Sequence, residues 1–319
     1  MMRMVAALAR LPALSLAVAW PVAPAWPQVP DGTVAASPFV VCMQQNVPPL
    51  SLRAGDRPSG FDLALATIVA RRLGRDLRVQ WFVSRDDPDS SLPKDADALL
   101  SDGRCHIVAE YPLTEGALEP PRSPVAKLPP FDGAKPDDRR RWVHSAELAA
   151  TRPYRLDTLT VVLSARDADR SVQRLADLAG MKIGVQTATL ADAIAMRYSN
   201  GRLSGNVVHV PDTHDLFTKL QAGELDTAFV DQRAFDAWQS RHASSGLAAS
   251  GYRHSIGFNM GFAGLASNRA LLDQVDAVLA DLQAHGGIAP LAAEAGLTFI
   301  PPRPVAVQPD VTLAALNAD

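Results

Sequence analysis

The chain has 319 residues, of which 47% are hydrophobic and 20% charged, and its formal net charge is −3 at pH 7. This composition is that of a globular protein large enough for two modest domains. It supplies no positive field for binding nucleic acid or an anionic membrane surface, so neither is expected as a partner.

The first 25 residues (1–25) have the pattern of a secretory signal peptide. Met1-Met2-Arg3 is a short positive region, and residues 11–20 are apolar but too few to span a bilayer about 30 Å thick. Ala23-Pro24-Ala25 then places small residues at the two positions that determine cleavage. We therefore expect export to the periplasm and a soluble mature protein. Cleavage near Ala35-Ala36 and an uncleaved N-terminal anchor are the alternatives.

A first α/β unit follows the leader. The apolar residues between 61 and 73 recur with helical spacing on one face, and Gly74 ends that helix. The unit is expected to have strands at 39–41, 77–83 and 107–109, and helices at 61–73 and 95–100. This alternating order predicts a parallel sheet with right-handed crossovers.

A second α/β unit follows an interruption. Residues 115–142 are rich in proline and charge and predict a long loop within the first unit. The segment 301–319 is also rich in proline and is expected to be loosely ordered. The second unit and the segment after it are expected to have strands at 159–163, 182–185, 207–210, 227–230 and 261–265, and helices at 171–178, 190–197, 213–222, 234–240 and 268–285.

The two cysteines lie at the borders of expected strands. Cys42 lies at the end of an apolar strand candidate at 38–43, and Cys105 opens another at 105–109. Export places them in an oxidising compartment, and neighbouring strands lie about 4.8 Å apart, within the Cα separation that a disulfide tolerates. We therefore expect a Cys42–Cys105 disulfide, with two buried free thiols as the alternative. Without a CxxC spacing or nearby histidine pairs, no metal site is expected.

Five short motifs occur in one order between residues 38 and 300. The first combines Pro48-Pro49-Leu50, Gly60-Phe61-Asp62-Leu63-Ala64 and a strand that ends in Thr114. The others are Thr151-Arg152-Pro153-Tyr154, Leu178 to Thr187, Leu220 to Asp231, and Gly261-Phe262-Ala263 with Gly286. In this order the motifs resemble those of the bacterial extracellular solute-binding proteins of family 3, which are periplasmic binding proteins of type II.

The resemblance implies a two-lobed α/β clamshell in which each lobe is a mostly parallel sheet flanked by helices. Lobe 1 then comprises residues 38–155 and 258–300 and includes the loop 115–142. Lobe 2 comprises residues 156–257, and residues 301–319 follow as a tail. Members of this family hold a small molecule between the lobes and deliver it to a transporter of the ABC type. We therefore expect a monomeric, non-enzymatic solute-binding protein whose partner is an ABC transporter permease.

A closer branch of the family shares further features. The strand ending in Cys42, the step Gly103-Arg104-Cys105 and the segment Thr151-Arg152-Pro153-Tyr154 are similar to binding-protein homologues associated with quinoprotein methanol and alcohol dehydrogenases. This likeness implies a periplasmic dehydrogenase as the partner and pyrroloquinoline quinone as the ligand; otherwise no cofactor is expected. The Trp-Gly-Pro segment of that branch is replaced here by Phe229-Val230-Asp231-Gln232.

The resemblance also indicates which residues bind the ligand. Such sites collect strand ends and helix N-termini, where unpaired N–H groups hold anions. Thr187 and Thr189 precede an expected helix and are candidates to bind a carboxylate, or to cap the helix. Arg152 is a candidate for a bidentate clamp on the same group, or for a surface or hinge ion pair. Asp231 matches the aspartate that accepts the ammonium group in amino acid binders, or it caps a helix.

Other polar candidates lie at the ends of the first lobe's strands or at the crossing between the lobes. They are Gln45, Asn46, Glu110, Tyr111, Thr114 and Tyr154. Amino acid binders carry an arginine shortly after the counterpart of Thr114, whereas residues 115–120 contain none. The expected ligand is therefore described only as a small polar molecule that bears a carboxylate.

Two other functions are compatible with the same scaffold, because a fold does not decide function. One is a periplasmic enzyme of the dehydratase kind that uses Glu110 and Asp231 as cleft carboxylates. The other is a module without a ligand that docks on a dehydrogenase through residues 115–142. The sequence contains no HExxH, no G-x-S-x-G and no P-loop motif, so it nominates no catalytic residue.

Overall fold

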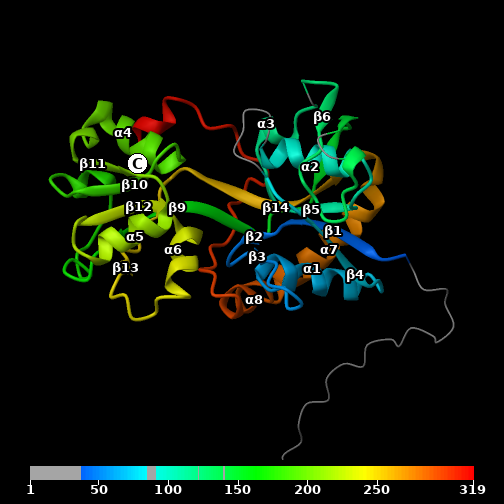
Figure 1. Cartoon of the computed structure of the whole chain (residues 1–319), viewed down its shortest axis with the longest axis horizontal. Coiled ribbons are helices and arrows are strands. Elements are labelled where there is room, and N and C mark those ends of the chain that lie inside the picture. The colour runs from blue at the N-terminus through cyan, green and yellow to red at the C-terminus, as the bar shows by residue number, and fades with distance from the viewer. Residues whose placement is uncertain (1–36, 85–90, 121, 139–140) are drawn as a thin grey trace, which may run out of the picture. The chain divides into compact units, whose positions relative to one another are not determined.

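The computed structural model describes residues 37–84, 91–120, 122–138 and 141–319. The predicted signal peptide lies outside these residues. In the described part of the chain, no helix combines the length and the apolar character that crossing a bilayer requires. This part folds into two α/β lobes that are joined by long strands (Figure 1).

Lobe 1 is built on the parallel strands β1 (Phe39–Gln44), β4 (Leu77–Phe82) and β5 (Ile107–Pro112), in the order β4-β1-β5. Alternate residues of β1 serve two cores. Phe39, Val41 and Met43 pack against α1 (Phe61–Arg72), α7 (Arg269–Ala284) and α8 (Ile288–Glu294). Val40 and Cys42 pack on the opposite face, against α2 (Leu92–Ser101). A strand with both faces buried explains the continuous apolar run that the sequence shows there.

Lobe 2 repeats the same strand order. Its parallel strands are β10 (Ile183–Gln186), β11 (Val207–Val210) and β12 (Thr227–Asp231), arranged β11-β10-β12. Helix α4 (Leu190–Gly201) covers one face of this sheet. Helices α5 (Thr213–Gln221) and α6 (Gln232–Gln239) cover the other.

Two nine-residue strands, β9 (Arg155–Leu163) and β14 (Gly257–Leu265), belong to both lobes. The first residues of β9 pair with β14, from Arg155 opposite Met260 to Thr158 opposite Gly257. From Leu159 onwards β9 pairs with β12 of lobe 2, and from Met260 onwards β14 pairs with β5 of lobe 1. A single hydrogen-bonded sheet therefore runs through the junction.

The segment expected to be a long loop contains short elements. Beyond α3 (Glu115–Leu118), β6 (Val125–Lys127) pairs with β7 (Trp142–His144), and Ala126 and Val143 are buried in the core of lobe 1. This hairpin forms despite the surrounding prolines, because each of its strands buries one apolar side chain in the core. The remaining short elements are β2 (Asn46–Val47), β3 (Ser51–Leu52), η1 (Pro136–Asp138), β8 (Leu148–Ala150), η2 (Leu175–Leu178), η3 (Ser204–Asn206), β13 (Ala248–Ala249), η4 (Ala266–Asn268) and η5 (Ala315–Asn317).

The expected disulfide is present. Cys42 and Cys105 are bonded, with their Cα atoms 5.6 Å apart. Cys42 lies inside β1 and Cys105 lies just before β5, so the bond joins two neighbouring strands of lobe 1. Both residues are buried in the core that α2 covers.

Removal of this disulfide by the double substitution Cys42→Ala and Cys105→Ala is expected to lower the free energy of unfolding. The bond spans a sequence separation of 63 residues. A loop of that length corresponds to about 4 kcal/mol in the chain-entropy model. Denaturant unfolding of the two proteins measures the difference. Titration of two free thiols in the denatured, unreduced wild type would contradict the pairing.

Candidate functional site

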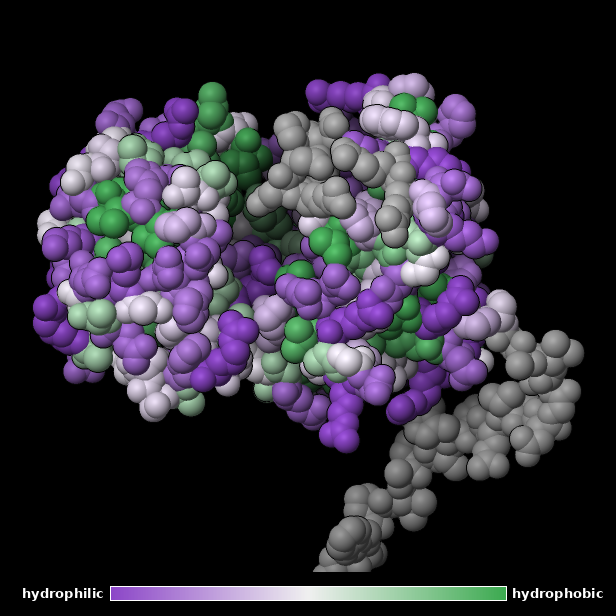
Figure 2. Space-filling view, in the orientation of Figure 1, coloured by the Kyte–Doolittle hydropathy of each residue, from purple (hydrophilic) through white to green (hydrophobic). Residues whose placement is uncertain are grey.

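The candidate site lies at the carboxyl ends of the parallel strands, where the strand order reverses. In lobe 2, β10 lies between β11 and β12, so the segments that leave β10 and β12 diverge. In lobe 1, β1 lies between β4 and β5 in the same way. Open α/β sheets bind ligands in the crevices at such reversal points. A recess is visible between the lobes at this place (Figure 2).

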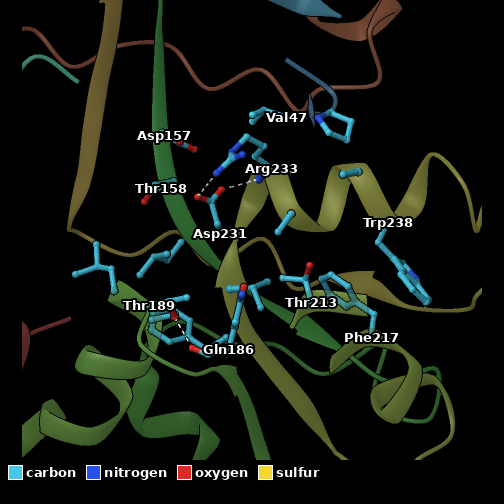
Figure 3. Close-up of a pocket in the computed structure, with 18 of the residues that line it drawn as sticks. Val47, Asp157, Thr158, Gln186, Thr189, Thr213, Phe217, Asp231, Arg233 and Trp238 are labelled. Atoms are coloured by element: carbon cyan, nitrogen blue, oxygen red, sulfur yellow. Dashed lines mark hydrogen bonds and ion pairs between the residues drawn. The ribbon is translucent and has the colours of Figure 1, made fainter. Parts of the chain in front are cut away.

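A cavity of about 440 Å³ occupies this crevice. Lobe 1 contributes residues 46–48 to its lining. The crossing strand β9 contributes residues 157–159, and residues 256–258 come from the start of β14 and the residue before it. Lobe 2 contributes the ends of β10 and β12 together with residues of α4, α5 and α6 (Figure 3). The volume is within the usual range for small-molecule pockets, so the cavity can hold a small metabolite.

The N-terminus of α4 forms one wall. Thr189 caps this helix, because its hydroxyl accepts the N–H of Asp192 at 3.3 Å and donates to the carbonyl of Gln186 at 2.7 Å. Gln186 and Thr189 both line the cavity. Thr187 instead donates its hydroxyl to the carbonyl of Val210 at 3.2 Å and is not among the lining residues.

Asp231 and Arg233 form an ion pair where the neighbouring strand β12 leads into α6 (Figure 3). Asp231 caps α6, because its Oδ1 accepts the N–H of Arg233 at 2.9 Å. Its Oδ2 lies 3.6 Å from Nη2 of Arg233. The side chain of Asp231 is 33% exposed and that of Arg233 is 29% exposed. One carboxylate thus serves as the helix cap and also faces the cavity. The adjacent guanidinium remains within reach of a ligand.

Further charges are buried beside the cavity, at the junction of the lobes. The side chain of Arg155 is 2% exposed, and its Nη2 lies 3.7 Å from Oε1 of Glu110. Its Nη1 lies 3.5 Å from Oδ1 of Asp157, which itself lines the cavity. Within the described residues, Oε2 of Glu110 and Nε of Arg155 have no hydrogen-bond partner. The cluster is therefore only partly satisfied by its own members.

A hydrogen-bond chain fixes Glu110. Its φ of 60° lies in the left-handed region, and the register opposite shifts between Gly261 and Ala263, which marks a β-bulge in β5. The N–H of Glu110 donates to the hydroxyl of Tyr154 at 2.9 Å, and this hydroxyl donates to Oδ1 of Asp62 at 2.9 Å. The uncommon backbone conformation persists because buried partners determine it.

Burial changes the proton affinity of these carboxyl groups. It raises the pKa of Glu110 to about 7, although Arg233 and Arg155 act in the opposite direction. Burial likewise raises the pKa of Asp62 to about 6, opposed mainly by Arg155 and by the hydrogen bond from Tyr154. Both shifts have the sign expected when desolvation outweighs the nearby cations.

Aromatic side chains make the apolar part of the cavity. Phe217, Phe229, Trp238 and Phe258 line it, and the rings of Phe217 and Trp238 pack with centroids 5.4 Å apart. The cavity thus combines the partly exposed Asp231–Arg233 ion pair with an apolar wall. Among the described residues, no group of three or more His, Cys, Asp or Glu side chains is placed to hold a metal ion.

Three of the residues that the sequence nominated line the cavity, namely Asn46, Thr189 and Asp231. Glu110 and Tyr154 are buried in the junction cluster and are not lining residues. Gln45 is also absent from the lining, although it directly precedes Asn46.

The other nominated residues are placed elsewhere. Arg152 forms an ion pair with Asp276 of α7, with Nη2 2.8 Å from Oδ2, in agreement with the ion pair that was the alternative prediction for this residue. Tyr111 is fully buried in the core of lobe 1 and donates its hydroxyl to the carbonyl of Ala117. Thr114 caps α3 by accepting the N–H of Ala117 at 3.2 Å. None of these three residues contacts the cavity.

Arg233, Asp157 and Trp238 line the cavity but are not among the residues predicted from the sequence. A local signal for Arg233 exists, because arginine in the first turn of a helix opposes the helix dipole and is uncommon without a compensating role. Asp157 could also be recognised from the sequence, because a charged residue inside a strand whose later residues are mostly apolar indicates a functional role. The position of Trp238 on an amphipathic helix gives no such indication.

Comparison with known proteins defines the fold. No protein-family model and no curated sequence matches the chain. The L-cystine solute receptor of Neisseria gonorrhoeae, in its unliganded open conformation, superposes with a TM-score of 0.58 at 15% identity, covering 84% of this chain and 96% of that one. Substrate binding domain 2 of Lactococcus lactis GlnP, in its open conformation, superposes with a TM-score of 0.58 at 17% identity. The match covers 82% of this chain and 97% of that one.

A third structure has a different role. A histidine kinase sensor domain with similarity to periplasmic binding proteins gives a TM-score of 0.52 at 16% identity, covering 83% of this chain and 98% of that one. These likenesses confirm the predicted two-lobed fold of the periplasmic binding proteins. They do not distinguish the quinoprotein-associated branch from the rest.

The raised pKa of Glu110 predicts a pH dependence of stability. Between its ordinary pKa of 4.5 and about 7, the folded protein binds a proton at Glu110 that the unfolded chain has lost. The contribution of this group to the free energy of unfolding therefore falls as pH rises through that range. We expect Glu110→Gln to flatten the decline between pH 5 and 8, as measured by denaturant unfolding. The exposed Glu294→Gln variant is the control, and equal slopes in all three proteins would contradict the assignment.

Proposed function

We propose that this protein is an exported solute-binding protein that holds a small polar, carboxylate-bearing molecule between its two lobes. The observation that carries the proposal is the partly exposed Asp231–Arg233 pair on the wall of a cavity lined by both lobes. The fold supports it, because this architecture places two strand-order reversals around one crevice.

Arg233 is the residue proposed to hold the carboxylate. Its distance of 3.6 Å to Asp231 exceeds the roughly 2.7–2.9 Å of a charge-assisted hydrogen bond, so the guanidinium retains donor capacity. Asp231 and Asp157 are placed to accept a cationic group on the same molecule. The aromatic wall then contacts the apolar remainder of the ligand. A zwitterion of the amino acid type satisfies all three features.

The arrangement favours binding over catalysis. The enzyme hypothesis requires Glu110 and Asp231 as cleft carboxylates, yet Glu110 is buried next to Arg155 and is not a lining residue. Asp231 faces the cavity but is engaged with the N–H and the guanidinium of Arg233. We propose that the bound solute is passed on unchanged to an ABC transporter permease, with a periplasmic dehydrogenase as the alternative partner.

Calorimetry of the purified protein against a panel of amino acids and related acids tests the proposal. Arg233→Gln is expected to weaken a carboxylate ligand at least tenfold, because a hydrogen bond to a charged group contributes about 1.5–3 kcal/mol. Asp231→Asn is expected to weaken only ligands that carry a cation, because asparagine retains the acceptor that caps α6. Arg152→Gln, which changes an arginine paired with Asp276, is the matched control and should leave affinity unchanged.

Three results would contradict the proposed ligand or its site. Loss of affinity in the Arg152 variant as well as the Arg233 variant would place the ligand elsewhere. If the quinone is the ligand, Asp231→Asn should leave its affinity unchanged or increase it, because the site loses a negative charge. Absence of heat with every acid and with the quinone would contradict the proposed solute-binding role and favour a module that acts only through a partner.

A further inference from the structure

Residues 301–319 were expected to be loosely ordered, but the structure holds them at three places. The first is the crossing strand β14, through the buried side chain of Asn259. Its Nδ2 donates to the carbonyls of Val305 at 2.8 Å and Ala306 at 3.1 Å, and its Oδ1 accepts the N–H of Arg303 at 2.9 Å. One buried amide therefore fixes the first part of this segment.

The second attachment is on lobe 1. The N–H of Gln308 donates to the carbonyl of Leu113 at 2.8 Å, and the carbonyl of Gln308 accepts the N–H of Glu115 at 2.9 Å. The side chain of Asp310 accepts the N–H of Gly116 at 3.1 Å. The segment therefore runs as an extra extended stretch beside the end of β5 and the start of α3.

The third attachment is on lobe 2. Leu316 is 7% exposed and belongs to the hydrophobic core that covers one face of the lobe 2 sheet. The carboxylate of Asp319 accepts the hydroxyls of Tyr198 at 2.8 Å and Tyr252 at 3.0 Å, and the N–H of Leu175 at 2.6 Å. This end is thus held by apolar burial together with charge-assisted hydrogen bonds.

The link between the second and third attachments is short. Only residues 311–315 lie between Asp310 and Leu316, and at about 3.6 Å per residue this link reaches roughly 20 Å at most. Within it, Leu313 is 68% exposed and Val311 is 37% exposed. The red trace in Figure 1 passes from lobe 1 near α3 to lobe 2 near α4. The link therefore spans the two lobes without being buried by either.

We propose that residues 301–319 form a strap that limits how far the two lobes separate. The strands β9 and β14 join the lobes at the junction and allow a hinge rotation about it. The strap joins them at a different place, so a rotation that separates Gly116 from Tyr198 must first extend the link and then break an attachment. This proposal goes beyond solute binding and does not depend on which solute is bound.

Lengthening the strap tests the proposal without removing any attachment. A flexible insert of eight Gly and Ser residues between Thr312 and Leu313 adds roughly 25–30 Å of reach. Spin labels on cysteines introduced at the exposed Arg71 of α1 and Arg197 of α4 report the distance between the lobes in the ligand-free protein. We expect the insert to shift the distance distribution to longer values and to broaden it.

The same insert placed between Asp169 and Arg170, in an exposed turn of lobe 2, is the matched control and should leave the distribution unchanged. A second variant, Tyr198→Phe with Tyr252→Phe, removes both hydroxyls that hold Asp319 and should broaden the distribution in the same direction. An unchanged distribution in the lengthened strap, or an equal change in the control insert, would overturn the proposal. Because no ligand is used, either result leaves the proposed solute binding untouched.

Discussion

The structure depends on a hydrogen-bond ladder that two long strands share at the junction of the lobes. β9 and β14 pair with each other there, and each then becomes a member of one lobe's sheet. Buried backbone N–H and C=O groups must be paired, so this ladder fixes where the two sheets meet. Both strand-order reversals consequently face one crevice, and residues from the ladder, including Asp157 and Phe258, form part of the cavity wall.

The same constraint explains why charge is buried at the junction. Arg155 opens β9, and Glu110 lies in a bulge of β5, which is separated from β9 by β14. The fold brings both residues into a region with little water. Ion pairs at 3.5–3.7 Å offset only part of the cost of removing such groups from water. The consequence is a set of carboxyl groups with raised pKa values next to a cavity. A charged group that enters the cavity changes the protonation of these carboxyl groups.

The strap changes what the junction can do. A two-strand connection by itself leaves one rotation free, whereas a further link at a different place restricts the amplitude of that rotation. Asn259 is central to this, because its side chain lies on β14 and holds the backbone of the strap. One buried amide therefore attaches the strap to the hinge strand.

From sequence patterns alone we predicted the class of fold and the disulfide, and we nominated Asn46, Thr189 and Asp231, which line the cavity. Alternating strand and helix patterns predicted the parallel strands of each lobe, and the family resemblance of five ordered motifs implied the two lobes. Both depend on local or sequential properties of the chain. The contacts between polar side chains depend on how the lobes pack. Arg152 and Arg155 are close in sequence, yet Arg152, which precedes β9, pairs with Asp276 of α7, whereas Arg155, the first residue of β9, pairs with Glu110 at the junction. The bulge at Glu110 and the docking of residues 301–319 depend on Tyr154 and Asn259, partners that lie far away in the sequence, and no local pattern specifies such contacts.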